Sequence, residues 1–205
     1  MKLTRLEPQR KSKRRVSVFL DGAYAFSLDE KTVSRLGLTP GAELSEADVE
    51  RIVRDDQLSR AKEYAALLLS YRARTEKEMQ ERLARKGFAP DIVAAAMDRL
   101  RELRLLDDEQ YARDFTRDRV TIGRKGKWNV RGELMKRGVA RKAIEAALAE
   151  APDELAVARD LAARYRQRHA RLEPEVLRRR LYAMLARRGF SPDVIRPALE
   201  LPEDE

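Results

Sequence analysis

The sequence predicts a mainly α-helical protein in which three tandem three-helix repeats form an elongated array behind a small N-terminal α+β module with a β-hairpin. Glycines at positions 87, 138 and 189 lie 51 residues apart, and each follows a pair of basic residues and precedes an apolar one. A fixed period of this length indicates a repeat architecture. Before the repeats, two strand-like segments flank Asp21-Gly22, a pair typical of two-residue hairpin turns.

The N-terminal module is expected to span residues 1–56. Arg15–Leu20 and Ala23–Leu28 are predicted to be the strands of the hairpin, because β-branched and aromatic residues are concentrated there. Two strands alone are only marginally stable in water. A third strand from Leu3–Glu7, or helices on one face of the hairpin, must therefore complete the module.

Two helices are predicted in the rest of this module. The first covers Asp29–Leu36 and ends at Gly37, since glycine is the commonest residue just past a helix C-terminus. The second begins at Ser45, with Asp48 three residues later, which is a typical start signal. We place the end of the module near Asp55-Asp56.

Each repeat is predicted to contain a helix that ends at its glycine, then a tight corner and a further helix. In the first copy, Leu83-Ala84-Arg85-Lys86-Gly87-Phe88, the glycine follows the last apolar-periodic residue and a basic pair, as at a helix C-terminus with a left-handed residue. The positive charges suit the negative end of the helix dipole. The apolar residue after each glycine can fold back onto its helix. In the first and third copies, a proline three residues after the glycine suits the first turn of the next helix.

The helix starts within the repeats follow from capping residues. Thr75 and Glu78 form a capping box that opens the middle helix of the first repeat. Asp107 is suited to cap the first helix of the second repeat, and Pro174 to start the middle helix of the third. One repeat is too small to bury a core alone, so neighbouring repeats must stack. We place the three repeats at residues 57–105, 106–151 and 152–205, the last with an acidic tail.

The composition excludes several classes of site. Without cysteine the chain has no disulfide framework and no thiolate metal site, and a single histidine, His169, cannot make a His-rich metal site or a Ser-His-Asp array. Gly123-Arg124-Lys125-Gly126-Lys127 lacks the spacing of a phosphate-binding loop. We therefore expect a non-enzymatic protein with no cofactor and no metal. No apolar run approaches the roughly 18 residues of a membrane span, so we expect a cytoplasmic protein without membrane contact.

The net charge of +9 points to a polyanionic partner or an acidic protein surface, with solubility as the simpler alternative. Clustering of the basic residues favours a partner. From Met1 to Arg15, seven lysines and arginines stand against Glu7 alone, and further clusters cover residues 117–142 and 164–188. The N-terminal cluster is either a flexible phosphate-binding arm or a charged edge of the module.

The candidate partner-binding residues come from the second and third clusters. Trp128, the only tryptophan, lies among arginines. It is suited to stack on bases or to anchor a protein interface, and the alternative that it is the core residue of its helix stays open. The full candidate set is Arg119, Arg124, Lys125, Lys127, Trp128, Arg131, Lys136, Arg137, Arg178, Arg179 and Arg180.

The chain resembles the RecX family of bacterial regulatory proteins over nearly its whole length. The resemblance rests on the repeated basic-glycine corners, on the hairpin Val16–Phe26, and above all on Leu105–Phe115, which reads Leu-Leu-Asp-Asp-Glu-Gln-Tyr-Ala-Arg-Asp-Phe. Gly126-Lys127-Trp128 departs from the loop expected of the family. The roles of the candidate residues follow from their position and charge and are not carried over from the family.

This resemblance implies a non-enzymatic modulator of the RecA recombinase. Proteins of this family bind in the helical groove of the RecA–DNA filament and usually restrain strand exchange, ATP hydrolysis and coprotease activity in homologous recombination, DNA repair and the SOS response. A basic helical array is physically suited to contact protein walls and DNA phosphates together. The implied partners are the RecA filament and single- or double-stranded DNA, and we expect the chain to be a monomer.

Two other classes of function stay open. The chain is alternatively a sequence-nonspecific DNA-binding helical module that acts without RecA, and its binding would then depend steeply on salt. Three-helix units can resemble helix-turn-helix domains, but no repeat pairs a short turn with a helix face suited to read bases. A passive scaffold for an acidic protein would instead have negligible affinity for DNA.

Overall fold

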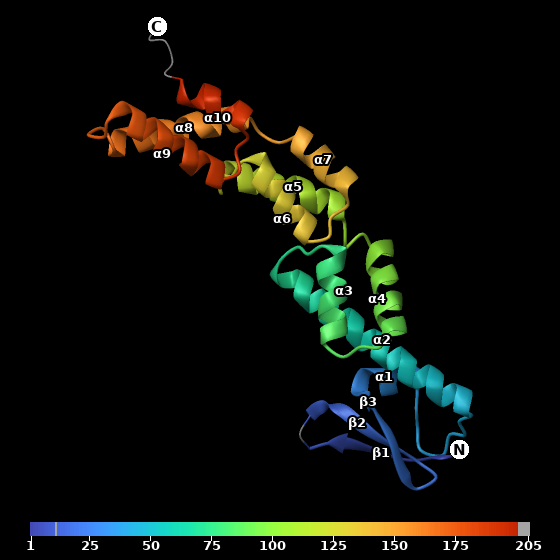
Figure 1. Ribbon diagram of the computed structural model, residues 1–205. Helices are drawn as coiled ribbons and strands as arrows, with labels where there is room; N and C mark the ends of the chain where they lie inside the picture. Colours follow the sequence, from blue (N-terminus) through green and yellow to red (C-terminus); the bar gives the residue numbers. More distant parts are fainter. Residues whose placement is uncertain (11, 201–205) are drawn as a thin grey trace. The chain divides into compact units, whose positions relative to one another are not determined.

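The computed structural model describes residues 1–10 and 12–200, with three strands and ten helices in that part of the chain (Figure 1). It confirms the mainly helical fold with three three-helix repeats and an N-terminal sheet. The acidic tail expected after the third repeat, and Lys11 of the N-terminal basic cluster, lie outside the described residues. The chain divides into two compact units, one of Met1–Arg72 with Met79–Leu105 and one of Ala73–Glu78 with the chain from Leu106 onwards.

The N-terminal sheet has three antiparallel strands in the order β1 (Leu3–Gln9), β2 (Ser12–Leu20) and β3 (Ala23–Asp29). Asp21 and Gly22 turn the β2–β3 hairpin with φ angles of 49° and 84°, as the sequence predicts. The N-terminal segment supplies the third strand. In the described part of the N-terminal basic cluster, Arg5, Lys13, Arg14 and Arg15 lie in these strands, Lys2 forms a bridge with Glu43 and Arg10 lies in the β1–β2 turn, so the cluster is part of the module and not a flexible arm.

Two helices cover one face of this sheet, α1 (Glu30–Leu36) and the first half of α2 (Glu46–Tyr71). The side chain of Asp29 accepts a hydrogen bond from the backbone N–H of Lys31 at 3.0 Å, which caps α1, and Gly37 ends it in the left-handed conformation. Burial of apolar side chains between the two layers stabilises the module. The core residues are Leu3, Val18, Leu20, Leu28 and Ile52.

α2 is a single helix of 26 residues that continues through the module boundary expected at Asp55-Asp56. Neither glycine nor proline interrupts it. The acidic pair lies within this helix and makes tertiary contacts, Asp55 with Arg35 and Asp56 with Arg15. Asp56 is only 2 % exposed, and its carboxylate accepts hydrogen bonds from Arg15 Nη1 at 3.1 Å and from the backbone N–H of Asp29 at 2.7 Å. A buried charge needs such partners, so Asp56 fastens α2 to the hairpin.

The second half of α2 packs against α4 (Pro90–Glu102) and forms the first repeat with α4 and α3 (Glu76–Arg85). The hydroxyl of Thr75 accepts a hydrogen bond from the backbone N–H of Glu78 at 3.2 Å, as expected for the start of α3. Apolar positions at helical spacing are the buried ones. They include Ala61, Ala65, Leu68, Met79, Leu83, Ile92, Ala96, Met97 and Leu100.

The second and third repeats have their own cores. The second contains α5 (Asp108–Thr121), α6 (Lys127–Lys136) and α7 (Arg141–Ala149), packed around Val120, Val130, Leu134, Ile144 and Leu148. The third contains α8 (Glu154–Arg168), α9 (Pro174–Arg187) and α10 (Pro192–Leu199), packed around Ala158, Leu161, Leu185, Phe190 and Ile195. No helix within the described ranges is both long and apolar enough to cross a membrane.

All three glycine corners have the geometry that the sequence predicts. Gly87, Gly138 and Gly189 have φ angles of 93°, 81° and 86°. In each corner the N–H of the glycine donates to the carbonyl three residues before it. The N–H of the following apolar residue donates to the carbonyl of the buried leucine, at 3.2–3.4 Å. This is the Schellman pattern, which satisfies the last carbonyls of a helix.

Candidate partner-binding surface

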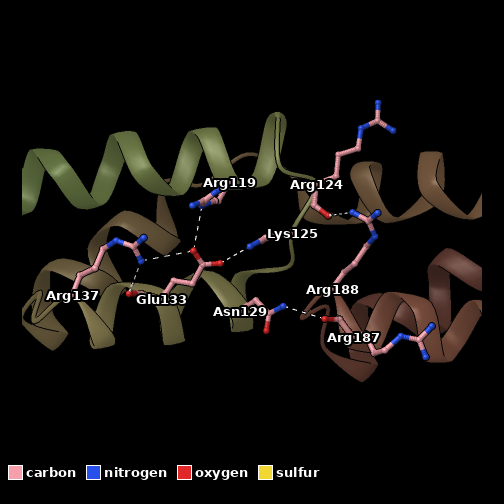
Figure 2. A network of polar contacts seen from close by, with 8 residues as sticks. All are labelled: Arg119, Arg124, Lys125, Asn129, Glu133, Arg137, Arg187 and Arg188. Atoms are coloured by element: carbon pink, nitrogen blue, oxygen red, sulfur yellow. Dashed lines mark hydrogen bonds and ion pairs between the residues drawn. The ribbon is translucent and has the colours of Figure 1, made fainter. Parts of the chain in front are cut away.

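The N-terminal end of α6 is joined to the corner of the third repeat. Gly126 lies so close to Gly189 that a Cβ atom on Gly126 would be 2.1 Å from the Gly189 carbonyl oxygen. Four hydrogen bonds cross this joint, and Figure 2 shows the last two of them. They run from Gly126 N to the Arg188 carbonyl (2.9 Å), Trp128 N to the Gly189 carbonyl (3.2 Å), Asn129 Nδ2 to the Arg187 carbonyl (3.2 Å) and Arg188 Nη1 to the Arg124 carbonyl (3.3 Å).

A related joint connects the first turn of α3 to the corner of the second repeat. Thr75 Oγ1 donates to the Arg137 carbonyl at 2.8 Å. The Lys77 side chain lies over Gly138, where an added Cβ would be 2.5 Å from Lys77 Cδ. In both joints, donors at the start of one repeat's middle helix bind carbonyls at the end of the following repeat's middle helix. The positive end of one helix dipole therefore faces the negative end of another. The Gly189 corner thus connects the second and third repeats as well as ending α9, and the Gly138 corner holds the Ala73–Glu78 segment, which belongs to the same compact unit.

Three of the candidate cations surround one carboxylate, Glu133 on α6 (Figure 2). Lys125 Nζ lies 2.6 Å from Glu133 Oε1, while Arg119 Nε and Arg137 Nη1 lie 3.3 and 3.8 Å from Oε2. Both guanidinium groups also stack on the ring of Phe115, at 4.8 and 4.6 Å from its centroid. The cluster holds more positive than negative charge, in a geometry fixed before any partner binds.

The pKa of the Glu133 carboxyl reflects this environment. Burial alone would raise the pKa of Glu133, because the side chain is only 23 % exposed. The hydrogen bond from Lys125 and the charges of Lys125, Arg119 and Arg137 outweigh the burial and hold the pKa below the ordinary value. Glu133 therefore stays ionised at neutral pH and anchors the three cations.

We expect Glu133→Gln to lower the free energy of unfolding at pH 7 by on the order of 1–2 kcal/mol, because three cations lose their shared counter-charge. A carboxyl with a depressed pKa in the folded state stabilises the fold above its unfolded pKa of about 4.5, and this contribution is lost as the pH falls through the folded pKa. The difference between the variant and the wild type should therefore shrink below about pH 4.5 in urea unfolding curves. Glu150→Gln, at an exposed glutamate, is the control. A pH-independent difference would contradict the assignment.

Other candidate cations are also paired within the chain. Arg124 Nη1 lies 2.6 Å from Asp160 Oδ2. Arg131 donates to both carboxylate oxygens of Glu145, at 3.0 and 2.7 Å, and this hydrogen bond lowers the pKa of Glu145. These two arginines tie α6 and its preceding loop to neighbouring helices, so they serve the fold in addition to any partner.

The solvent-facing side of α6 consists of the exposed Trp128, Met135 and Lys136 and the half-buried Gly132, which we call the α6 face. Trp128 is 68 % and Met135 62 % exposed, so the alternative of a core tryptophan is wrong. Val130 and Leu134 fill the core in its place, one helical turn apart on the opposite side. Lys136 and the neighbouring Lys127 have no ion-pair partner among the described residues. Exposed apolar side chains beside unneutralised cations are typical of interaction surfaces.

Arg178, Arg179 and Arg180 are exposed on α9 in the third repeat, also without an ion pair in the part of the chain that the structure describes. Arg178 and Arg179 line a cavity between α9 and α10. The structure thus brings Arg119, Lys125 and Arg137 together around Glu133, and it carries the α9 arginines on a separate repeat.

Sequence reasoning missed Glu133 and Asn129. The spacing of Glu133 to Arg137, four residues later on a predicted helix, was an available signal for an ion pair. Asn129 had no comparable signal, because its hydrogen bond reaches the Arg187 carbonyl, 58 residues further along the chain.

Comparison with known proteins identifies relatives over nearly the whole chain. Family models match in order along it, namely the regulatory protein RecX N-terminal domain at residues 1–45 and the RecX first, second and third three-helix domains at residues 61–100, 107–148 and 152–199. The regulatory protein RecX of Bacillus cytotoxicus is 30% identical over 212 residues, which cover 99% of this chain and 77% of that protein. The one from Listeria welshimeri is 28% identical over 200 residues, covering 97% and 74%.

Solved structures agree with these matches. A crystal structure of a regulatory protein RecX superposes with a TM-score of 0.71 at 28% identity, covering 95% of this chain and 97% of that one. RecX from Lactobacillus salivarius superposes with a TM-score of 0.67 at 25% identity, covering 71% of this chain and 96% of that one. The shared domains, their order along the chain and the shared fold establish that the chain belongs to the RecX family of regulatory proteins.

Proposed function

We propose that the chain is a non-enzymatic, cytoplasmic regulator that binds the RecA–DNA filament and restrains its recombinase, ATPase and coprotease activities. Its relatives are named regulatory proteins. The resemblance of the sequence to the RecX family supports RecA as the target. The charge and exposure of the second and third repeats support a target that combines protein with DNA.

The α6 face is the observation that carries this proposal. Trp128 and Met135 present apolar surface, while the ammonium groups of Lys136 and of Lys127 at the start of the helix form no ion pair among the described residues. The backbone N–H of Lys127 donates to Glu154 Oε2 at 2.8 Å. A recombinase filament on DNA can bind both kinds of side chain, since its protein surface can pack against an exposed tryptophan and its DNA phosphates can form ion pairs with lysines. A naked duplex would leave the apolar part of this face without a partner.

Two further groups of candidate residues add positive charge to the proposed binding surface. Arg178, Arg179 and Arg180 extend the positive surface onto the third repeat. Arg119, Lys125 and Arg137 surround Glu133, the residue after Gly132 on α6, and this cluster provides a fixed surplus of positive charge. Cations held in place lose less conformational entropy on binding than free side chains do.

The proposal is tested by measuring DNA-dependent ATP hydrolysis by the cognate RecA while this protein is added at less than one molecule per RecA. DNA is kept in excess, so that competition for DNA sites cannot reduce the rate. We expect hydrolysis to stop at a few molecules per filament, because a regulator of a polymer needs to act at only a few positions along it.

An unchanged rate of hydrolysis would contradict the proposal. If the same preparation then bound naked DNA with a steep salt dependence, the alternative of a sequence-nonspecific DNA-binding module without RecA would take its place. If it bound neither RecA nor DNA, the passive scaffold for an acidic protein would remain.

A further inference from the structure

A cavity of about 640 Å³ opens between α9 and α10 in the third repeat. Its volume lies within the range of small-molecule sites in proteins. Its wall mixes apolar, aromatic and charged side chains. The lining residues are Glu175, Val176, Arg178, Arg179, Tyr182, Arg196 and Leu199.

The apolar wall of this cavity is held in place by the core of the third repeat. On α10, Ile195 and Ala198 are almost completely buried and anchor the helix against α8. Arg166 Nη2 donates to the carbonyl of Leu199 at 2.6 Å and so fixes the end of α10, which provides Leu199 to the cavity. The cavity is therefore built by packed helices and not by a loop.

The charged side chains that line the cavity indicate a ligand with negative charge. Arg178, Arg179 and Arg196 have no ion-pair partner among the described residues, and Glu175 is the one acidic residue in the described lining. A cationic ligand would be repelled, and a purely apolar ligand would leave the guanidinium groups without acceptors. Arginine forks match the oxygens of phosphate and carboxylate groups.

The aromatic residue narrows the choice further. Tyr182 is 41 % exposed, so its ring is accessible for stacking, with Val176 and Leu199 as apolar neighbours in the lining. A ligand that satisfies the whole wall must combine a flat ring with negative charge. An unstacked nucleotide has both, whereas a duplex keeps its bases stacked and offers only its phosphates.

We propose that the α9–α10 cavity holds an unstacked nucleotide of a single DNA strand, with its base against Tyr182 and its flanking phosphates at Arg178, Arg179 and Arg196. This rests on the proposed function, because it takes the DNA of the filament as the ligand. It adds a site that prefers single strands to duplex, on a different repeat from the α6 face.

The test is the affinity of the full chain for a fluorescent oligothymidine single strand and for a duplex of equal length, measured by anisotropy over a range of salt concentrations without RecA. Tyr182→Ala should weaken single-strand binding about tenfold, leave duplex binding unchanged and leave the salt dependence as it is, because stacking is not electrostatic. Tyr182→Phe keeps the ring and should bind like the wild type.

Two arginines of α9 provide a matched pair of variants. Arg179→Ala removes a charge from the cavity, whereas Arg187→Ala removes the same charge from the exposed last turn of the same helix, outside the lining. Arg179→Ala should reduce the ratio of single-strand to duplex affinity and lower the salt slope by about 0.7 for the single strand. Arg187→Ala should leave that ratio unchanged.

Equal weakening of single-strand and duplex binding by Tyr182→Ala, or equal effects of the two arginine variants, would overturn the cavity as a nucleotide site. Because these measurements contain no RecA, they separate the two proposals. If the wild type restrains RecA but Tyr182→Ala binds single strands as tightly as the wild type, the nucleotide site is refuted and the regulatory function stands. If the variants change single-strand binding as expected but the wild type has no effect on RecA, the nucleotide site stands and the regulatory function is refuted.

Discussion

Gly126→Ala should lower the free energy of unfolding by about 2–4 kcal/mol, because it forces apart the joint between the second and third repeats. The new Cβ atom would lie 2.1 Å from the carbonyl oxygen of Gly189 and 2.3 Å from the backbone nitrogen of Phe190. Both contacts are with backbone atoms, so no side chain can rotate away to relieve them. The effect should appear as a lower midpoint in urea unfolding followed by circular dichroism.

Gly132→Ala is the matched control for this prediction. Gly132 lies inside α6, of which Gly126 is the N-cap, and a Cβ added to Gly132 meets no atom within 4 Å. Alanine is the better helix former, so this variant should be more stable than the wild type by about 0.5–1 kcal/mol. Gly126 has a φ of −73°, which alanine adopts readily. A difference in sign between the two variants would therefore isolate the steric contact, and a stable Gly126→Ala would mean that the joint is not formed in solution.

The double variant Trp128→Ala/Lys136→Glu should raise the concentration needed for half-maximal restraint of RecA about tenfold or more, since a tryptophan at the centre of an interface often dominates its affinity. Both side chains are exposed and neither makes an ion pair among the described residues, so the fold should not change. The readout is the same RecA ATPase titration, with circular dichroism and thermal unfolding of the variant to establish that it is folded.

Lys142→Glu is the control for the charge change. It reverses an exposed lysine on α7, in the same repeat but outside the α6 face, and should leave the titration unchanged. Arg124 and Lys125 are less suitable for such a test, because their partners Asp160 and Glu133 would face a like charge after reversal. If the double variant restrained RecA as well as Lys142→Glu does, the α6 face would not be part of the binding surface.

The features that the sequence predicts well depend on local interactions. The glycine corners, the caps at Ser45, Asp107 and Thr75, and the hairpin turn all involve partners within a few residues. Capping and turn preferences act at this range, so residue type and spacing suffice to identify them. The family resemblance uses the same local signals, which explains why it covers nearly the whole chain.

Features that depend on distant partners were missed or misplaced. The buried role of Asp56 could not be predicted, because Arg15, which donates a hydrogen bond to its carboxylate, lies 41 residues earlier in the chain. The sequence alone does not decide whether Trp128 is buried or exposed. Val130 and Leu134 are equally suitable core residues of the same helix by their spacing, and they are the buried ones. The contact between Gly126 and Gly189 could not be predicted either. Gly126 is expected in a loop and Gly189 at a helix corner, and neither expectation implies that the two glycines are close together.

α2 has a further consequence for how the N-terminal sheet takes part in binding. One unbroken helix carries both the residues that pack on the sheet and those that pack on α4, and Asp56 locks it to the hairpin near its middle. The sheet is therefore a rigid extension of the first repeat and not a ligand on a tether. Any group that it touches on a partner is presented at a fixed distance from the first repeat. Such a contact adds to the affinity without the entropy cost of closing a flexible linker, and it is strong only where the partner has the matching spacing.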